Sequence, residues 1–308
     1  MFSLAVSFVA YLCVRALLCI AQSMRLETCE SFCSLLASLL TDVLRLRRRI
    51  ILENLRHAYP EWSDAQRLAV ARQMWRHLLF SIVETAQFRR KIRLTNWRDY
   101  LRLKKTEEFT RIMLSGRPRV MVGGHFGNFE LGGYIMALFG YTNHGVARPL
   151  DNPFLDRWAY GHRNIDGQHI LSKRGDHERI RDILANGGAV IFLADQYAGS
   201  KGCWVEFFGR PASAHKAVPL FAFDCGGLVL AGHCRRVGPP LHYEMTMDGV
   251  VDVLDPPASL AGVRELTQWY TSRLEDAVQL APEQYWWLHR RWKDRRAQNK
   301  AARRMRAA

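Results

Sequence analysis

The feature that most constrains the fold is the stretch of residues 119–133, RVMVGGHFGNFELGG. Residues 120–122 form a short apolar run of the kind found in a buried strand, and two glycines end it. Asn128 is a suitable N-cap for a helix that runs to Phe139. The stretch therefore predicts a strand that leads into a helix through a glycine-rich turn.

His125 lies in this turn, at the C-terminal end of the predicted strand, where open α/β sheets build their ligand sites. Glu130 falls in the first turn of the predicted helix, from where its carboxylate can reach back to the imidazole. A carboxylate beside a histidine fixes the tautomer and stabilises the imidazolium ion. The pair predicts a general base. The alternative is a polar histidine at a helix start, with a glutamate that only favours the helix dipole.

From Arg117 onward, short apolar runs alternate with helical stretches, which is the pattern of βαβ units and predicts an α/β fold. A capping box at Ser63 and Gln66 predicts that an earlier helix begins at Asp64. The predicted strands are 120–123, 144–148, 168–171, 189–194, 228–233 and 243–247, and the predicted helices of this part are 128–139, 153–162, 176–186, 216–224 and 258–280.

Two further side chains follow predicted strands. Arg148 ends one apolar run, and Asp195 comes directly after the run AVIFLA. If these strands are parallel, His125, Arg148 and Asp195 share one edge of the sheet. The alternatives are a surface or inter-loop salt bridge for Arg148 and Arg163, and a turn residue that closes a strand for Asp195. Arg163 ends the helix between them.

The string GGHFGNFELGG resembles the H-x4-D/E motif of the glycerolipid acyltransferases. Within them it is most similar to the branch that contains the lipid A late acyltransferases and the phosphatidylinositol mannoside acyltransferases. Other blocks resemble the lipid A enzymes in the same order and at similar spacing, over about residues 45–293. They are RPLDNPFLDRW (148–158), GHRN (161–164), LADQYAG (193–199), FFGRPA (207–212) and PEQYWWLHRRWK (282–293).

This resemblance implies a glycerolipid-acyltransferase-like mixed sheet flanked by helices, preceded by a helical, membrane-associated region. It implies His125 as the base, Glu130 as its partner, and Arg148, Arg163 and Asp195 as substrate-contacting residues. The expected reaction moves a fatty acyl chain from a thioester of acyl carrier protein or coenzyme A to a hydroxyl of a lipid A precursor. No resident cofactor or metal is expected. The alternatives are acyl transfer to a phosphatidylinositol mannoside or another glycolipid, and a non-catalytic basic membrane-surface protein.

The charge balance implies an acidic partner, which is nucleic acid, an anionic membrane face, or an acidic substrate or carrier; with the resemblance, we expect a membrane partner and no nucleic acid. Lys and Arg number 44 against 29 Asp and Glu, a net charge of +15, with clusters at Arg45–Arg49 and in the C-terminal tail. The first twenty residues are apolar apart from serines and Arg15, which predicts an anchor that spans the membrane or lies in its interface. The alternative is a buried amphipathic helix that continues through residues 33–46. The resemblance implies the bacterial inner membrane, with the active site facing the cytoplasm.

The expected organisation is an anchor at residues 1–22, a helical region at 23–115, an α/β core at 116–293 and a basic tail at 294–308. Seven cysteines without framework spacing indicate a reducing compartment. The stretch 196–219, with aromatic side chains among glycines, is expected either to line a groove for an acyl chain or to form a hairpin packed on the core.

Overall fold

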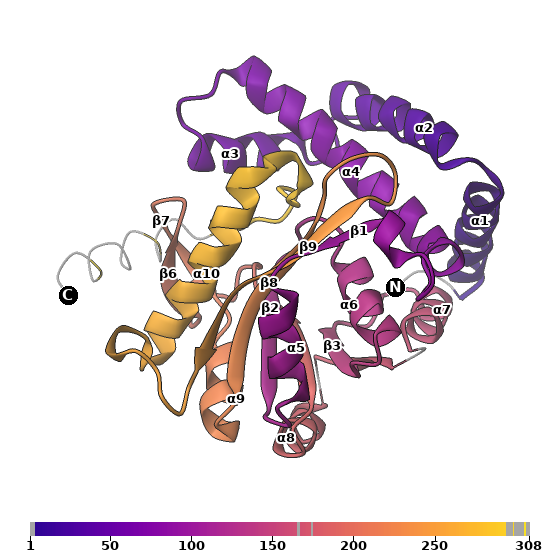
Figure 1. Ribbon diagram of the computed structural model, residues 1–308. Coiled ribbons are helices and arrows are strands. Elements are labelled where there is room, and N and C mark those ends of the chain that lie inside the picture. The colour runs from indigo at the N-terminus through magenta and orange to yellow at the C-terminus, as the bar shows by residue number, and fades with distance from the viewer. Residues whose placement is uncertain (1–3, 165–166, 174, 294–297, 299–304, 306–308) are drawn as a thin grey trace.

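A mixed sheet forms the centre of the computed structural model, which describes residues 4–164, 167–173, 175–293, 298 and 305 (Figure 1). Within these residues the sheet has seven strands, parallel to their neighbours except for one antiparallel pair, β8 with β9. In spatial order the strands are β1 (Leu101–Leu103), β9 (Tyr243–Asp252), β8 (Leu228–Arg236), β2 (Arg119–Gly123), β5 (Ala189–Leu193), β3 (Asn143–Ala147) and β4 (Gln168–Ser172).

Helices cover both faces of this sheet and extend beyond it at the N-terminal side (Figure 1). The N-terminal helices are α1 (Leu4–Ser23), α2 (Leu26–Ser38), the π-helical turn η1 (Leu39–Val43), α3 (Arg48–Ala58) and α4 (Asp64–Lys91). The helices that follow are α5 (Thr106–Leu114), α6 (Phe129–Leu138), α7 (Pro153–Arg163), α8 (His177–Ala185), α9 (Ala217–Cys225) and α10 (Val263–Leu280).

The side chains of β2 alternate between two apolar layers, as expected for a central strand buried on both faces. Val120 and Val122 pack in the cluster that contains α8, α9 and α10. Met121 faces the opposite layer, where Phe109 of α5 packs. This double burial explains why the sequence of β2 is a continuous apolar run.

The structure confirms the predicted α/β fold and the six predicted strands, and it adds three strands. The sequence gives no signal for β1, which lies in the expected helical region, because three residues are too few to show a periodicity. The other two, β6 (Cys203–Phe207) and β7 (Arg210–Ala214), form an antiparallel hairpin in the stretch 196–219. Phe207 of this hairpin is fully buried against Trp292, so the stretch takes the packed-hairpin alternative. The expected tail at 294–308 lies outside the described residues, apart from 298 and 305.

The predicted starts of two helices are confirmed by their capping contacts. The Asn128 side chain accepts a hydrogen bond of 3.1 Å from the backbone N–H of Leu131. Ser63 and Gln66 form the reciprocal capping box at the start of α4. Both contacts satisfy backbone N–H groups that have no partner inside their own helix.

A buried ion pair joins the helical region to the sheet. Glu84 on α4 is 0% exposed, and its carboxylate accepts hydrogen bonds from the Arg236 guanidinium and the Tyr243 hydroxyl. The backbone N–H of Leu241 donates to the same carboxylate at 2.6 Å. The two regions therefore share one polar network, which is buried and holds the β8–β9 connection against α4.

We expect Glu84→Ala to reduce the free energy of unfolding by about 3–5 kcal/mol, because it leaves the Arg236 charge buried and without its partner. Urea unfolding of the full-length protein in detergent, followed by tryptophan fluorescence, measures this change. Glu61→Ala is the control, since Glu61 is exposed and its loss should change stability by less than about 0.5 kcal/mol. Equal unfolding midpoints for the two variants would contradict the structural role of Glu84.

Candidate active site

His125 and Asp195 lie side by side because their strands are paired in register. Gly123 at the end of β2 pairs with Leu193 at the end of the neighbouring parallel strand β5. His125 and Asp195 each come two residues after these positions. Parallel strands end at the same edge of a sheet, so the two side chains meet at its C-terminal edge.

Both oxygens of the Asp195 carboxylate bind His125. The Nδ1–H group of the imidazole donates to Oδ1 at 2.7 Å, and the backbone N–H of His125 donates to Oδ2 at 3.0 Å. A proton on Nδ1 leaves the lone pair of Nε2 free to accept a proton. The structure thus fixes the tautomer that a histidine base requires.

The electrostatic balance of the pair favours a charged Asp195 carboxylate. Burial lowers the pKa of His125, but the charge and hydrogen bond of Asp195, helped by the charge of Glu130, outweigh this effect and raise the pKa above its usual value. Burial raises the pKa of Asp195, and the charge and two hydrogen bonds of His125 more than reverse this and hold it well below its usual range. The imidazole is therefore a stronger base than an isolated histidine.

The turn that carries His125 is held by bonds from distant parts of the chain. Gly127 has a φ of +59°, and a Cβ atom there would lie 1.9 Å from the carbonyl oxygen of Cys234. Its N–H donates to the carbonyl of Gln284 at 3.1 Å, and the N–H of Trp286 donates to the carbonyl of His125 at 3.0 Å. Only glycine fits position 127, which accounts for the glycine that follows HF in the motif.

His77 on α4 adds a further contact to this turn. Its Nε2–H donates to the carbonyl of Gly127 at 3.1 Å. Burial, with the nearby Arg236 charge, lowers the pKa of His77 to about 3, so the ring stays neutral near pH 7. A neutral donor holds the turn without placing a second positive charge beside His125.

Aromatic side chains from the C-terminal block surround the imidazole. The ring centroid of Trp286 lies 5.0 Å from that of His125, and the His289 centroid lies 5.1 Å away. Burial and the neighbouring His125 charge lower the pKa of His289 to about 4. The sequence analysis did not place these residues at the site, because their separation of more than 150 residues leaves no local pattern.

Glu130 has a different partner from the one that its spacing predicts. Its carboxylate is bound by the guanidinium of Arg163, with Arg163 Nε donating to Oε2 at 3.1 Å and a second contact from the terminal nitrogen. Asp195 therefore makes the hydrogen bond to His125 that was expected of Glu130. The Glu130 carboxylate lies near enough to contribute to the raised pKa of His125.

Arg148 is the one predicted site residue that the structure leaves outside this group. It follows β3, which is separated from β2 by β5. Its guanidinium pairs with Asp151, and the two side chains are 70% and 88% exposed. The surface salt bridge is thus the arrangement that the structure shows for Arg148.

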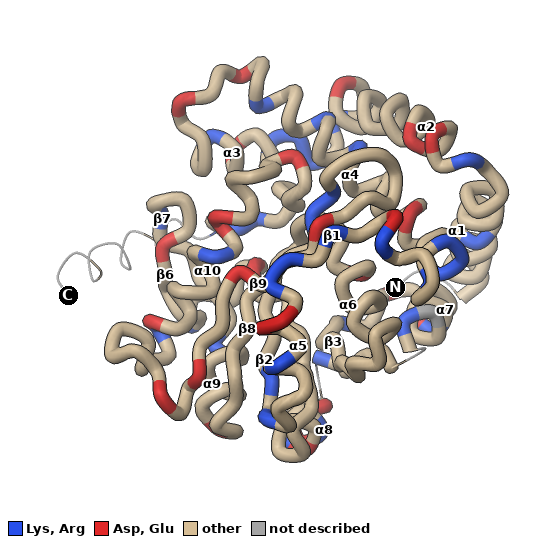
Figure 2. The backbone as a smooth tube through the Cα atoms, viewed as in Figure 1, with Lys and Arg blue, Asp and Glu red and all other residues tan. Residues whose placement is uncertain are grey.

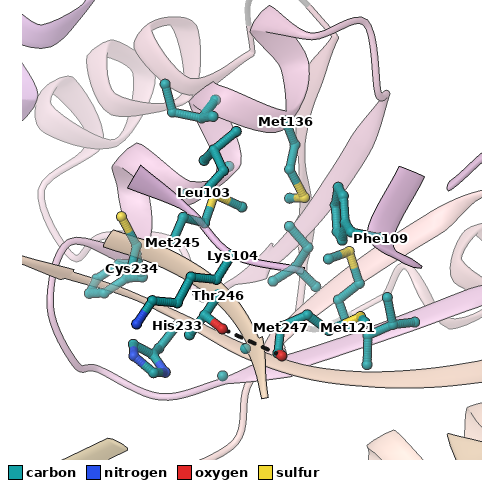
Figure 3. Close-up of a pocket in the computed structure, with 18 of the residues that line it drawn as sticks. Leu103, Lys104, Phe109, Met121, Met136, His233, Cys234, Met245, Thr246 and Met247 are labelled. Atoms are coloured by element: carbon teal, nitrogen blue, oxygen red, sulfur yellow. Dashed lines mark hydrogen bonds between the residues drawn. The ribbon is translucent and has the colours of Figure 1, made fainter. Parts of the chain in front are cut away.

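An apolar cavity of about 570 Å³ lies between the sheet and helices α5 and α6 (Figure 3). One of its lining residues is Phe129, whose ring centroid lies 5.3 Å from that of His125. Gly124 and Phe126, the two neighbours of His125 in sequence, line it at the edge of the sheet. Figure 3 shows methionine and aromatic side chains around the space. They include Met121, Met136, Met245, Met247 and Phe109. Its size is in the range of small-molecule pockets, and flexible methionine side chains adapt to varied apolar shapes.

Fold and site define an α/β protein with a largely buried His–Asp pair on a turn that lines a large apolar cavity. Comparison with known families gives the class a name. The model of the bacterial lipid A biosynthesis acyltransferases matches residues 2–294. The chain belongs to this family and is an acyltransferase, which confirms the resemblance seen in its motifs.

Three curated proteins illustrate the relationship. The lipid A biosynthesis lauroyltransferase of Escherichia coli (strain K12) is 26% identical over 84% of this chain and 83% of its own length. The lipid A biosynthesis palmitoleoyltransferase of the same organism is 26% identical over 82% and 80%. A lipid A biosynthesis acyltransferase of Haemophilus influenzae (strain ATCC 51907 / DSM 11121 / KW20 / Rd) is 25% identical over 81% and 78%.

We expect Asp195→Asn to lower acyl transfer roughly 10²–10⁴-fold, because the amide no longer fixes the productive tautomer. The pH profile of kcat/KM gives a second measurement. The base works unprotonated, so activity falls as the pH drops through the raised pKa of His125. Without the Asp195 charge, burial lowers that pKa, and the acidic limb should move to lower pH.

Asp151→Asn is the matched control, since the Asp151 carboxylate is exposed and pairs only with the surface residue Arg148 among the contacts described. It should leave both the rate and the acidic limb unchanged. A limb that stays in place in Asp195→Asn would show that another group sets it.

Proposed function

We propose that the protein transfers a fatty acyl chain from a thioester of acyl carrier protein or coenzyme A to a hydroxyl of a lipid A precursor. The observation that carries this proposal is the His125–Asp195 pair on a turn whose residues Gly124 and Phe126 line an apolar cavity. The names of the curated relatives support the lipid A acceptor. The apolar lining supports a fatty acyl donor.

In this mechanism His125 is the general base. Its Nε2 takes the proton of the acceptor hydroxyl while the oxygen attacks the thioester carbonyl carbon. The tetrahedral intermediate expels the thiolate, whose conjugate thiol has a pKa of about 8.5, and the imidazolium returns the proton to that sulfur. Asp195 holds the ring and stabilises its charged form. The thioester is already activated, so no covalent enzyme intermediate is needed.

The oxyanion of this intermediate requires a donor other than the N–H groups of residues 125–127. The N–H groups of residues 125, 126 and 127 donate to Asp195, to the carbonyl of Gly124 and to the carbonyl of Gln284. All three are therefore committed to holding the turn. A side-chain donor at the edge of the sheet can supply the stabilisation.

Arg163 is the donor that we assign to this role. Its guanidinium carries five N–H groups, and its two contacts with Glu130 leave others free to face a substrate. Glu130 then orients Arg163 and adds to the negative potential around His125. Donors aimed at a developing oxyanion typically contribute a factor of roughly 10²–10³ to the rate.

The cavity beside His125 is the site that we assign to the acyl chain. It runs from Gly124 at the edge of the sheet towards Met121, Met136 and Phe109 beneath helices α5 and α6. A chain that enters from the edge places its carbonyl next to the imidazole. The depth of the cavity then limits the chain length.

The charge of the protein supports an anionic acceptor, an acidic carrier and a location at the cytoplasmic face of the bacterial inner membrane. Lys and Arg are spread over the described elements, and in the whole chain they exceed Asp and Glu by 15 (Figure 2). The helix α1 is the one described helix long and apolar enough to cross a bilayer. Soluble acyl thioesters are made in the cytoplasm, which favours an active site on that side.

We expect His125→Ala to lower acyl transfer to a lipid A precursor by roughly 10²-fold or more, since it removes the base. Mass spectrometry of the acceptor after incubation with lauroyl-acyl carrier protein or lauroyl-coenzyme A measures the product and identifies the donor. His177→Ala is the control, because His177 is exposed on α8. Turnover within tenfold of the wild type, in a variant with an unchanged melting profile, would rule out His125 as the base.

We expect Met136→Trp to shift the preference towards shorter acyl chains, because the larger side chain occupies the inner part of the cavity. The ratio of kcat/KM for two donors that differ in chain length measures this shift. Leu220→Trp adds the same bulk to an exposed position on α9 and should leave the ratio unchanged. An unchanged ratio in Met136→Trp would place the chain elsewhere.

A further inference from the structure

The helix α1 is attached to the rest of the protein at both of its ends. Near its start, the Asn152 side chain donates to the carbonyl of Ser7 at 2.8 Å. Near its end, the Gln87 side chain donates to the carbonyl of Ala21 at 2.7 Å, and Gln22 donates to the carbonyl of Ala86 at 2.8 Å. Because the helix rises 1.5 Å per residue, these attachments are about 21 Å apart along its axis.

Between these ends, one side of α1 packs continuously against the body. The partly or fully buried positions recur at helical spacing and include Ser7, Tyr11, Val14, Leu18 and Ala21. The helix α7 also packs against α1. Its Phe154 ring lies 5.1 Å from that of Phe8, and the ring of its Trp158 lies 5.6 Å from the Arg15 guanidinium. The two helices lie side by side in Figure 1.

This attachment is incompatible with α1 standing across a bilayer. A spanning α1 would carry α7 into the hydrocarbon layer, together with the Asp156 and Arg157 side chains and the irregular backbone around Asn152. Charges at the bilayer centre cost several kcal/mol each, and lipid-exposed irregular backbone leaves polar groups without partners. In a membrane-bound protein, both ends of α1 would therefore lie at the membrane surface, at the same depth as the rest of the protein.

The outward side of α1 is nevertheless apolar and exposed. Val9 and Ile20 are 58% and 55% exposed, and both lie opposite the packed stripe. The next segments along the chain also carry exposed apolar side chains, on α2, on η1 and shortly after η1. They are Phe32, Leu35, Leu36, Leu39, Val43, Leu44 and Leu46. We name this set, together with the outward side of α1, the apolar face.

A cluster of positive charge borders the apolar face. Arg45, Arg47 and Arg49 follow η1 directly, and all three are exposed. An apolar surface edged by arginines complements an anionic bilayer, where side chains enter the acyl boundary and guanidinium groups meet the phosphates. Charge complementarity thus favours a lipid surface over a second protein as the occupant.

We propose that α1, α2 and η1 lie in the plane of an anionic membrane as one interfacial contact surface, and that α1 does not cross the bilayer. This proposal rests on the membrane association in the proposed function and specifies its geometry. It also connects the membrane to the site, because α7, which packs on α1, ends at Arg163 beside Glu130. An amphiphilic acceptor can then stay in the leaflet while its hydroxyl reaches His125.

Fluorophore depth measures the orientation of α1. Single cysteines are introduced as Val9→Cys and Ile20→Cys in full-length protein that carries Cys13→Ser, Cys19→Ser and Cys225→Ala, and they are labelled with an environment-sensitive dye. Both positions face the same side of the helix and are about 16 Å apart along its axis. Depth-dependent quenching in vesicles of phosphatidylethanolamine and phosphatidylglycerol should place both dyes at equal, shallow depth. Depths that differ by about 16 Å would overturn the proposal.

A second set of variants tests η1 and the identity of the occupant. Vesicles should shield the introduced cysteine of Val43→Cys from a water-soluble thiol reagent as well as they shield that of Val9→Cys. The cysteine of the control Leu254→Cys lies in an exposed loop and should stay accessible to the reagent. Val43→Asp should weaken vesicle binding about tenfold, the equivalent of one buried valine. Shielding that appears without vesicles, together with a dimer in light scattering, would overturn the proposal in favour of a second copy of the chain.

Acyl transfer in detergent micelles, measured on the same labelled variants, separates this proposal from the proposed function. Equal shallow depths in a protein that transfers no acyl group would support the membrane geometry and contradict the proposed function. Unequal depths in an active enzyme would contradict only the proposed orientation of α1 in the membrane.

Discussion

The carboxylate of Asp195 holds the active site together, because it binds both the backbone and the imidazole of His125. One side chain thereby joins the ends of β2 and β5, selects the Nδ1–H tautomer and raises the basicity of the ring. Each of these effects depends on the in-register pairing of Gly123 with Leu193. The sheet therefore sets the geometry of the candidate site directly, and a shift of one residue between these strands would separate the Asp195 carboxylate from the imidazole.

Local sequence patterns predicted well those elements of the fold that neighbouring residues specify. The apolar run of β2, the Gly-Gly turn and the Asn128 cap are all local signals, and the structure has each of them. The parallel arrangement also placed His125 and Asp195 at one edge. What the pattern could not show was the partner of each group, since Glu130 is five residues from His125 and Asp195 is seventy residues away. The nearer carboxylate was the natural expectation, and the Arg163 side chain binds it instead.

Other parts of the site had no local signal at all. The bonds from Gln284 and Trp286 to the His125 turn, and the contact of the tilted His289 ring with the imidazole, join segments that no periodicity relates. The strand β1 is three residues long and finds its register only by pairing with β9. The sequence predicted most of the regular elements, whereas long-range packing decided which side chains complete the site.

The bonds that Gln284 and Trp286 make to the turn have a consequence for the order in which the protein matures. These residues leave the ribosome more than 150 residues after the turn that they hold, whereas α1, α2 and α4 are all made before that turn. The helices that we propose to contact the membrane are therefore made before the turn has its supports. If they bind lipid as we propose, a nascent chain can reach the membrane before it can handle an acyl thioester.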